Sequence, residues 1–94
     1  MSVTAMVLIK AQPAQSAALA SAIAEVRGVS EVFSVAGRYD LVAIVRAARN
    51  EELADIVSGA IHLLPGIVES ETLIAFRAYS RSELAEGTSL FMDE

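Results

Sequence analysis

The 94-residue chain contains no cysteine, a single histidine and two prolines. The absence of cysteine excludes disulfides and thiolate metal ligands, and it agrees with a cytoplasmic location. One histidine, His62, among scattered carboxylates makes a poor ligand set, so we expect no metal site. No stretch approaches the ~18 consecutive apolar residues of a membrane helix. We therefore expect no association with a membrane.

Basic residues are also scarce, since seven lysines and arginines stand against twelve acidic residues, for a formal net charge of −5. Such a chain does not bind phosphate backbones unaided, which argues against direct nucleic-acid binding. Hydrophobic residues nonetheless make up 54% of the sequence. A chain of this length forms one domain with one core. The excess of apolar residues predicts that part of its surface is a subunit interface.

Two periodicities alternate along the chain. Residue alternation and β-branched content predict strands, whereas the i, i+3, i+4 spacing of apolar residues predicts helices. Asn50 is a predicted N-cap, with Glu51 and Glu52 in the first helical turn, where negative charge is favourable. Gly28 and Pro65-Gly66 are predicted to end the helices. The predicted strands are residues 3–11, 30–36, 39–48 and 67–79, and the predicted helices are residues 14–27 and 50–64.

The resulting order is β-α-β-β-α-β, which is typical of the α+β ferredoxin-like fold: a four-stranded antiparallel sheet with both helices on one face. This domain covers residues 1–79, and residues 80–94 form a C-terminal tail. Within the tail, residues 82–87 suit a short helical turn. The apolar residues 90–92 either belong to a frayed end or pack on a neighbouring subunit.

Both faces of the predicted sheet are apolar. In the strand 39–48, Tyr39, Leu41 and Ala43 point one way and Val42 and Ile44 the other. The two helices cover one face, and a second copy of the same sheet is the simplest cover for the other. The sequence therefore favours a homodimer, arranged as a dimeric α+β barrel. The alternative is a monomer with one apolar face exposed to water.

Two segments carry a resemblance to a known family: GVSEVFSVAGRYDLVAIVRA and, after the second helix, LPGIVESETLIA. In their order and spacing they resemble the effector-sensing domain of the Lrp/AsnC family of transcriptional regulators, from about Val3 to Tyr79. Family members usually carry a helix-turn-helix domain before the sensor, whereas here the first strand begins at residue 3. The chain is thus most similar to the stand-alone sensors called regulation of amino-acid metabolism domains.

The resemblance implies an assembly and a ligand. Such sensors dimerise with their sheets face to face, and the dimers form octameric or decameric rings. An amino acid or related small metabolite binds between dimers. Regulation of transcription would then act through a DNA-binding paralogue, which agrees with the acidic composition.

The turn Gly37-Arg38-Tyr39-Asp40 is the main candidate site. The family pattern carries over onto Gly37, Tyr39, Asp40 and, more loosely, Thr72. Asp40 is then the expected acceptor for the ammonium group of an amino acid, and the backbone N–H groups of the turn are the expected donors to its carboxylate. Arg38 lies outside the pattern, and could pair with Asp40 or favour an acidic ligand. The alternative is an ordinary hairpin turn.

His62, near the end of the second predicted helix, has two interpretations. It is either an exposed residue favoured near the negative end of the helix or part of the effector pocket. No catalytic residue and no cofactor are expected. Two other classes of function remain open: a cofactorless, monooxygenase-like enzyme built on the dimeric barrel, and an oligomeric scaffold. The enzyme needs a polar pocket between helices and sheet, where this sequence is aliphatic.

Overall fold

The structure is a computed structural model that describes residues 2–81, so the predictions for residues 82–87 and 90–92 of the tail lie outside the described residues. The β-α-β-β-α-β order is confirmed. Its elements are β1 (Val3–Ala11), α1 (Ser16–Ala24), β2 (Val29–Ser34), β3 (Leu41–Ala47), α2 (Asn50–Gly59), the short 3-10 helix η1 (Ile61–Leu63) and β4 (Ile67–Ala75).

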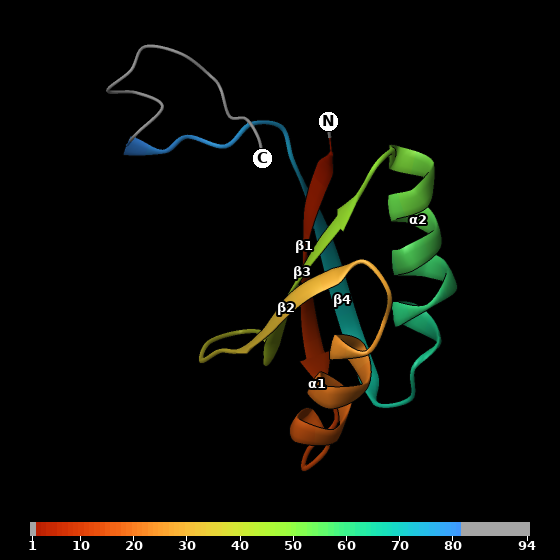
Figure 1. Cartoon of the computed structure of the whole chain (residues 1–94). Coiled ribbons are helices and arrows are strands. Elements are labelled where there is room, and N and C mark those ends of the chain that lie inside the picture. The colour runs from red at the N-terminus through yellow and green to blue at the C-terminus, as the bar shows by residue number, and fades with distance from the viewer. Residues whose placement is uncertain (1, 82–94) are drawn as a thin grey trace.

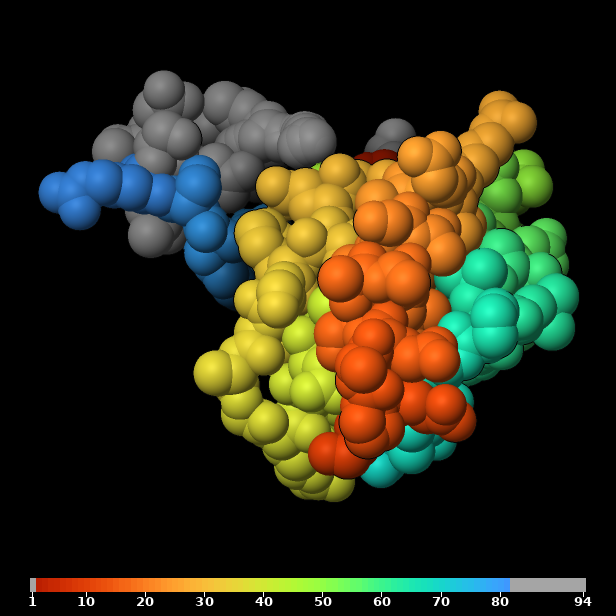
Figure 2. Space-filling view, turned by 90° about the horizontal axis from the view of Figure 1, so that it is seen from below, coloured from red at the N-terminus to blue at the C-terminus, as the bar shows by residue number. Residues whose placement is uncertain are grey.

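The four strands form one antiparallel sheet in the order β2-β3-β1-β4, so β2 and β4 are the outer strands. α1 packs on β2 and β3, and α2 packs on β1 and β3 (Figure 1). Seen from the end of the sheet, α1 lies between the β2 region and the α2–η1 region (Figure 2). This is the ferredoxin-like α+β fold that the sequence predicts.

The core lies between the helices and one face of the sheet. It is built entirely from aliphatic side chains, and no polar or charged side chain is buried among residues 2–81. The strands contribute alternate residues and the helices contribute one stripe each, as the two periodicities require. The buried residues are Ala5, Val7, Ile9, Ala11, Leu19, Ile23, Leu41, Ala43, Val45, Leu53, Val57 and Ile61.

Several predicted boundaries were wrong. α1 begins at Ser16 rather than at residue 14, because Ala14 has a φ of 68° and interrupts the helical path. Asn50 is the first helical residue rather than the N-cap, a position that Arg49 occupies. The carboxylate of Glu52 accepts a hydrogen bond of 2.8 Å from the backbone N–H of Ala48, which supports this helix start in the way that a capping box does.

The ends of the other elements also differ from the prediction. α2 ends at Gly59, and Ala60, with φ −130°, separates it from η1, so residues 50–64 are not one helix. β3 begins at Leu41, two residues later than predicted, and β4 ends at Ala75, four residues earlier. Only the first strand, Val3–Ala11, has the predicted bounds.

The sheet face away from the helices, called the open face below, has an apolar centre. The register places Leu8 opposite Val42 on β3, and Met6 opposite Ile44 on β3 and Leu73 on β4. Phe33 on β2 lies opposite Val42 and is 48% exposed. Partners in antiparallel strands share a face, so these six side chains form one continuous apolar surface.

Candidate functional site

The β2–β3 loop (residues 35–40) is fixed to the end of β1 by backbone hydrogen bonds. Val35 N–H donates to the carbonyl of Asp40 at 3.0 Å and closes the loop, while Asp40 N–H donates to the carbonyl of Ile9 at 2.8 Å. Gly37, at the tip, has a φ of 129°, which disfavours any residue with a Cβ. The loop therefore has a defined conformation before any ligand is considered.

Asp40 anchors this loop with its side chain as well. The backbone N–H of Ala11 donates to Asp40 Oδ2 at 2.8 Å, in a half-buried position. The carboxylate thus gives Ala11 a hydrogen-bond acceptor beyond Ile9, where the pairing of β1 with β3 ends. Because a carboxylate has about four acceptor positions on two oxygens, one contact of this kind leaves acceptor capacity for a second donor.

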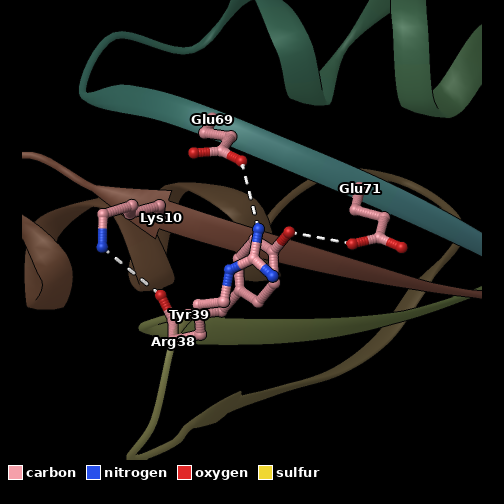
Figure 3. Close-up of polar contacts among 5 residues, drawn as sticks. All are labelled: Lys10, Arg38, Tyr39, Glu69 and Glu71. Carbon is pink, nitrogen blue, oxygen red and sulfur yellow. Dashed lines mark hydrogen bonds and ion pairs between the residues drawn. The ribbon is translucent and has the colours of Figure 1, made fainter.

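Tyr39 turns to the opposite side of the sheet from Leu41, contrary to the alternation predicted for residues 39–48. Its hydroxyl donates a 2.8 Å hydrogen bond to Glu71 Oε1. Glu71 lies opposite Leu8 in the β1–β4 register and so belongs to the open face. The ring lies in front of β1 (Figure 3). The alternation fails because Tyr39 precedes β3 and is not part of its pleat.

The carboxylate of Glu71 changes the acidity of Tyr39. The hydrogen bond to Glu71 is the main cause that raises the pKa of the Tyr39 phenol above its ordinary value, with smaller contributions from desolvation and from the negative charge of Glu71. The cation of Arg38 acts in the opposite direction. The phenol therefore keeps its proton as a hydrogen-bond donor throughout the neutral range.

Arg38 pairs with Glu69 and not with Asp40, which corrects one of the two roles considered for it. Its Nη2 lies 4.0 Å from Glu69 Oε2, and its side chain is 79% exposed. The guanidinium carbon also lies 5.6 Å from the centre of the Tyr39 ring, within the range of a cation–π contact. Lys10 Nζ donates to the carbonyl of Arg38 at 3.3 Å (Figure 3). These exposed contacts are weak and easily exchanged for others.

Within residues 2–81, the backbone N–H groups of Gly37, Arg38 and Tyr39 have no hydrogen-bond acceptor. The loop thus offers free donors next to a carboxylate that keeps spare acceptor capacity. An α-amino acid presents the complementary pair, a carboxylate and an ammonium group. This arrangement can bind a small zwitterion through charge-assisted hydrogen bonds.

His62 and Thr72 lie elsewhere. Thr72 is opposite the core residue Val7 in the β1–β4 register, so it shares the sheet face covered by the helices. His62 is exposed in η1, and its Nε2 lies 2.9 Å from the hydroxyl of Ser70, which is two residues from Thr72 on the same face of β4. Within one chain, the side chains of Arg38 and Tyr39 therefore reach the open face, whereas His62 and Thr72 lie on the helix side of β4.

Three residues of the loop cluster were not predicted: Lys10, Glu69 and Glu71. Each is a charged residue at a position where its strand alternates toward the open face. The sequence does contain this alternation, as Glu-Ser-Glu in residues 69–71. Their proximity to the loop could not be predicted, because it depends on the strand register.

Other kinds of site receive no support from the described residues. Residues 2–81 contain no group of three or more metal-ligating side chains of the His, Cys, Asp or Glu type. None of the helices in this part of the chain is long and apolar enough to cross a membrane.

Comparison with known proteins shows the family. The sequence model of the Lrp/AsnC ligand binding domain matches residues 4–85. A curated relative, the uncharacterized HTH-type transcriptional regulator PF0250 of Pyrococcus furiosus, is 37% identical over 76 residues, which are 78% of this chain and 51% of the relative. The chain thus spans about half the length of the curated relatives it matches. It belongs to the Lrp/AsnC family, through the ligand-binding domain.

Solved structures agree with this assignment. The crystal structure of TTHA0845 from Thermus thermophilus is 52% identical, with a TM-score of 0.79, and the match covers 84% of this chain and 99% of that one. A feast or famine regulatory protein of M. tuberculosis, solved as a complex with L-methionine, is 25% identical with a TM-score of 0.65. That match covers 84% of this chain and 54% of the mycobacterial chain.

Proposed function

We propose that this domain senses a free amino acid or a related small metabolite, and that the β2–β3 loop binds the ligand's zwitterionic part. The observation that carries the proposal is the combination of free N–H groups at Gly37, Arg38 and Tyr39 with the adjacent Asp40 carboxylate. Asp40 accepts the ammonium group of the ligand while it continues to hold Ala11. The loop N–H groups bind the ligand carboxylate.

Family membership supports the ligand class. The matching domain is the ligand-binding domain of the family, and one relative of the same fold was solved with L-methionine. A free amino acid is therefore the first class of ligand to test. Arg38, which is exposed and weakly paired with Glu69, is positioned to contact a ligand side chain beyond the zwitterion.

The two groups of candidate residues support a binding site shared between subunits. Gly37, Arg38, Tyr39 and Asp40 lie at the β2–β3 loop, whereas His62 and Thr72 lie on the helix side of β4. Among residues 2–81, no hydrogen bond or ion pair joins the two groups. We propose that the loop of one subunit and the His62–Thr72 region of another enclose the effector.

The apolar open face supports dimerisation as the first step of this assembly. Half-buried Leu8 and Val42, together with Phe33 at 48% exposure, form a surface suited to a second copy of the sheet. Dimers would then join in a higher oligomer of the octamer or decamer type. An effector bound between dimers favours the assembled state by its differential affinity.

We further propose that the sensor acts on transcription in the cytoplasm through a DNA-binding protein of the same family. The curated relatives are HTH-type regulators, and the acidic composition does not suit direct contact with nucleic acid. The enzymatic alternative needs polar groups between helices and sheet. Its support is poor, because the core of the described residues is entirely aliphatic.

A thermal-shift screen against the twenty amino acids tests the proposal. An effector at about a hundred times its Kd should stabilise the protein by roughly 2.7 kcal/mol per site. Asp40→Ala should abolish this effect, and so should Asp40→Asn, which removes the charge but keeps an oxygen for Ala11 N–H. Asp55→Asn, a matched loss of one exposed carboxylate on α2, should retain it. Stabilisation that survives Asp40→Asn would exclude Asp40 as the ammonium acceptor.

Mixed assemblies test the shared site. Asp40→Asn and Thr72→Val subunits should each fail to bind alone, whereas co-assembled subunits should recover part of the binding, because some sites then receive two intact halves. Absence of any recovery would contradict a site shared between subunits. No response of the wild-type protein to any amino acid would overturn the proposed ligand class.

A further inference from the structure

Consecutive residues at the end of β1 hold the β2–β3 loop. The carbonyl of Ile9 accepts a hydrogen bond of 2.8 Å from Asp40 N–H, and Ala11 N–H donates at 2.8 Å to the Asp40 carboxylate. Between them, Lys10 Nζ donates at 3.3 Å to the carbonyl of Arg38 (Figure 3). The first two contacts fix the place where the loop joins β3. The Lys10 contact acts farther into the loop, on the peptide group that precedes Tyr39.

This contact fixes the direction of that peptide group. The carbonyl of Arg38 and the N–H of Tyr39 belong to the same trans peptide, and in a planar trans peptide these two bonds point in opposite directions. Because the carbonyl points toward Lys10 Nζ, the N–H of Tyr39 points away from it. This N–H is one of the free donors that we propose for the carboxylate of an effector.

Lys10 also opposes the reversed orientation of the same peptide. A peptide group can rotate about the line that joins its two Cα atoms, which exchanges the positions of its C=O and N–H. In that orientation the Arg38 carbonyl would replace the donor, and its oxygen would repel a carboxylate. A single hydrogen bond to the carbonyl changes the ratio of the two orientations by roughly three- to tenfold, so even an exposed contact is sufficient.

The other free donors of the loop have no comparable support. The N–H groups of Gly37 and Arg38 belong to the peptides that carry the carbonyls of Ala36 and Gly37, and neither carbonyl accepts a hydrogen bond from any residue in the range 2–81. In addition, a cation at a carbonyl oxygen polarises the peptide and makes its N–H a stronger donor. The N–H of Tyr39 is therefore the donor whose direction the structure sets.

We propose that Lys10 is a positioning residue of the effector site and gives it a preference for ligands with a free α-carboxylate. Lys10 holds the peptide between Arg38 and Tyr39 with its N–H available to the ligand, and does not itself contact the ligand. This inference rests on the function proposed above, because it requires that the loop bind the zwitterionic part of a metabolite. It adds a residue outside the turn and a measurable selectivity.

Glycine and glycinamide are suitable probes, because both lack a side chain and only glycine has a carboxylate. Their dissociation constants can be measured from the amide NMR shifts of residues 37–40. The wild-type protein should bind glycine more tightly than glycinamide. Lys10→Met, which keeps a long side chain without the ammonium group, should weaken glycine binding by roughly three- to tenfold and reduce this preference. Lys10→Arg, which keeps a cationic donor, should restore it.

Two further measurements separate positioning from charge and from folding. Arg49→Met removes one exposed cation beside α2 and should leave both dissociation constants unchanged. Without any probe, the residual dipolar coupling of the Tyr39 N–H reports its direction, and this coupling should change in Lys10→Met but not in Lys10→Arg. The unfolding free energy should be nearly the same in all these variants, because the side chains that change are exposed.

The outcomes distinguish this role from the proposed sensing function. An unchanged preference for glycine in Lys10→Met, an unchanged Tyr39 coupling, or a loss that Lys10→Arg does not restore would each overturn the role of Lys10 and retain the sensing function. Equal binding of the two probes by the wild-type protein would overturn the carboxylate preference. A wild-type loop that responds to neither probe would overturn the zwitterion site itself, and the assignment of Lys10 with it.

Discussion

The Tyr39 hydroxyl donates a 2.8 Å hydrogen bond to Glu71 Oε1 and so joins residues 32 positions apart in the chain. Through this bond the β2–β3 loop reaches across β1 to the outer strand β4 (Figure 3). The next residue, Asp40, reaches instead to the backbone of Ala11. Two consecutive side chains thus fasten one loop at two places, and each attachment can be tested separately.

The pKa of Tyr39 can be used to test its hydrogen bond to Glu71. In a Tyr79→Phe protein, Tyr39 is the sole tyrosine, and its ionisation can be followed by ultraviolet absorbance. Glu71→Gln keeps an acceptor but removes the charge, so the pKa of Tyr39 should fall toward its ordinary value. An unchanged titration midpoint would show that the two groups do not interact in solution.

The same hydrogen bond makes the unfolding free energy depend on pH. The folded-state pKa of Tyr39 is raised, so its contribution is fully present below the unfolded-state pKa of about 10 and is lost as the pH rises through the folded value. The difference in unfolding free energy between wild type and Tyr39→Phe should thus be constant near neutrality and shrink in alkali. Urea titrations at several pH values measure it, and a difference that grows in alkali would contradict this assignment.

The second attachment predicts a difference between two substitutions of Asp40. Asp40→Ala leaves the N–H of Ala11, a residue that is 8% exposed, without its acceptor, and should cost about 1–3 kcal/mol of unfolding free energy. Asp40→Asn keeps an oxygen at that position and should cost less. Amide exchange at Ala11 should accelerate in the alanine variant only. Equal effects of both substitutions would mean that the charge, and not the hydrogen bond, holds the loop.

Gly28 should be the glycine least tolerant of substitution. It has a φ of 97°, and an added Cβ would overlap the side chain of Ile56. Gly28→Ala should therefore lower the unfolding free energy by roughly 1–3 kcal/mol. Gly59→Ala is the matched control, because nothing lies within 4 Å of its added Cβ. That helical substitution should be neutral or stabilising by up to about 1 kcal/mol. A Gly28 variant as stable as the control would contradict the packing at Ile56.

Shortening a side chain of the aliphatic core should lower the unfolding free energy strongly. Ile23 is 0% exposed, and Ile23→Ala should reduce the unfolding free energy by about 2–5 kcal/mol through lost burial and a residual cavity. Leu63→Ala removes a side chain that is 75% exposed and should change it by less than about 0.5 kcal/mol. Chemical denaturation compares the two directly. A larger effect at Leu63 would reveal an additional contact there.

Sequence patterns were sufficient for the fold because the two periodicities depend on neighbouring residues alone. Alternation in Val3–Ala11 predicted both ends of β1 correctly. The helices end at Ala24 and Gly59, before the breaks predicted at Gly28 and Pro65-Gly66. Helix starts were less predictable. Asn50 is a good N-cap by residue type, yet Arg49 takes that position, and Ala14 adopts a left-handed conformation that its residue type does not favour.

The candidate site was predictable only where the motif is local. Gly37, Arg38, Tyr39 and Asp40 are adjacent in the chain, so their proximity required no knowledge of the sheet. Lys10, Glu69 and Glu71 reach the loop through strand register, and for the same reason the pairing of Arg38 with Glu69 could not be predicted. Residues 37–40, 62 and 72 stay predictions as effector contacts. Their division between the β2–β3 loop and the helix side of β4 could not be derived from one sequence.

That division has a consequence for how such a sensor would respond to the amount of protein. If the loop and the His62–Thr72 region complete each other only across subunits, a dilute chain carries half-sites. Its apparent affinity for the effector then rises with its own concentration. The gene dosage of the protein, and not the metabolite alone, would set the threshold of the response.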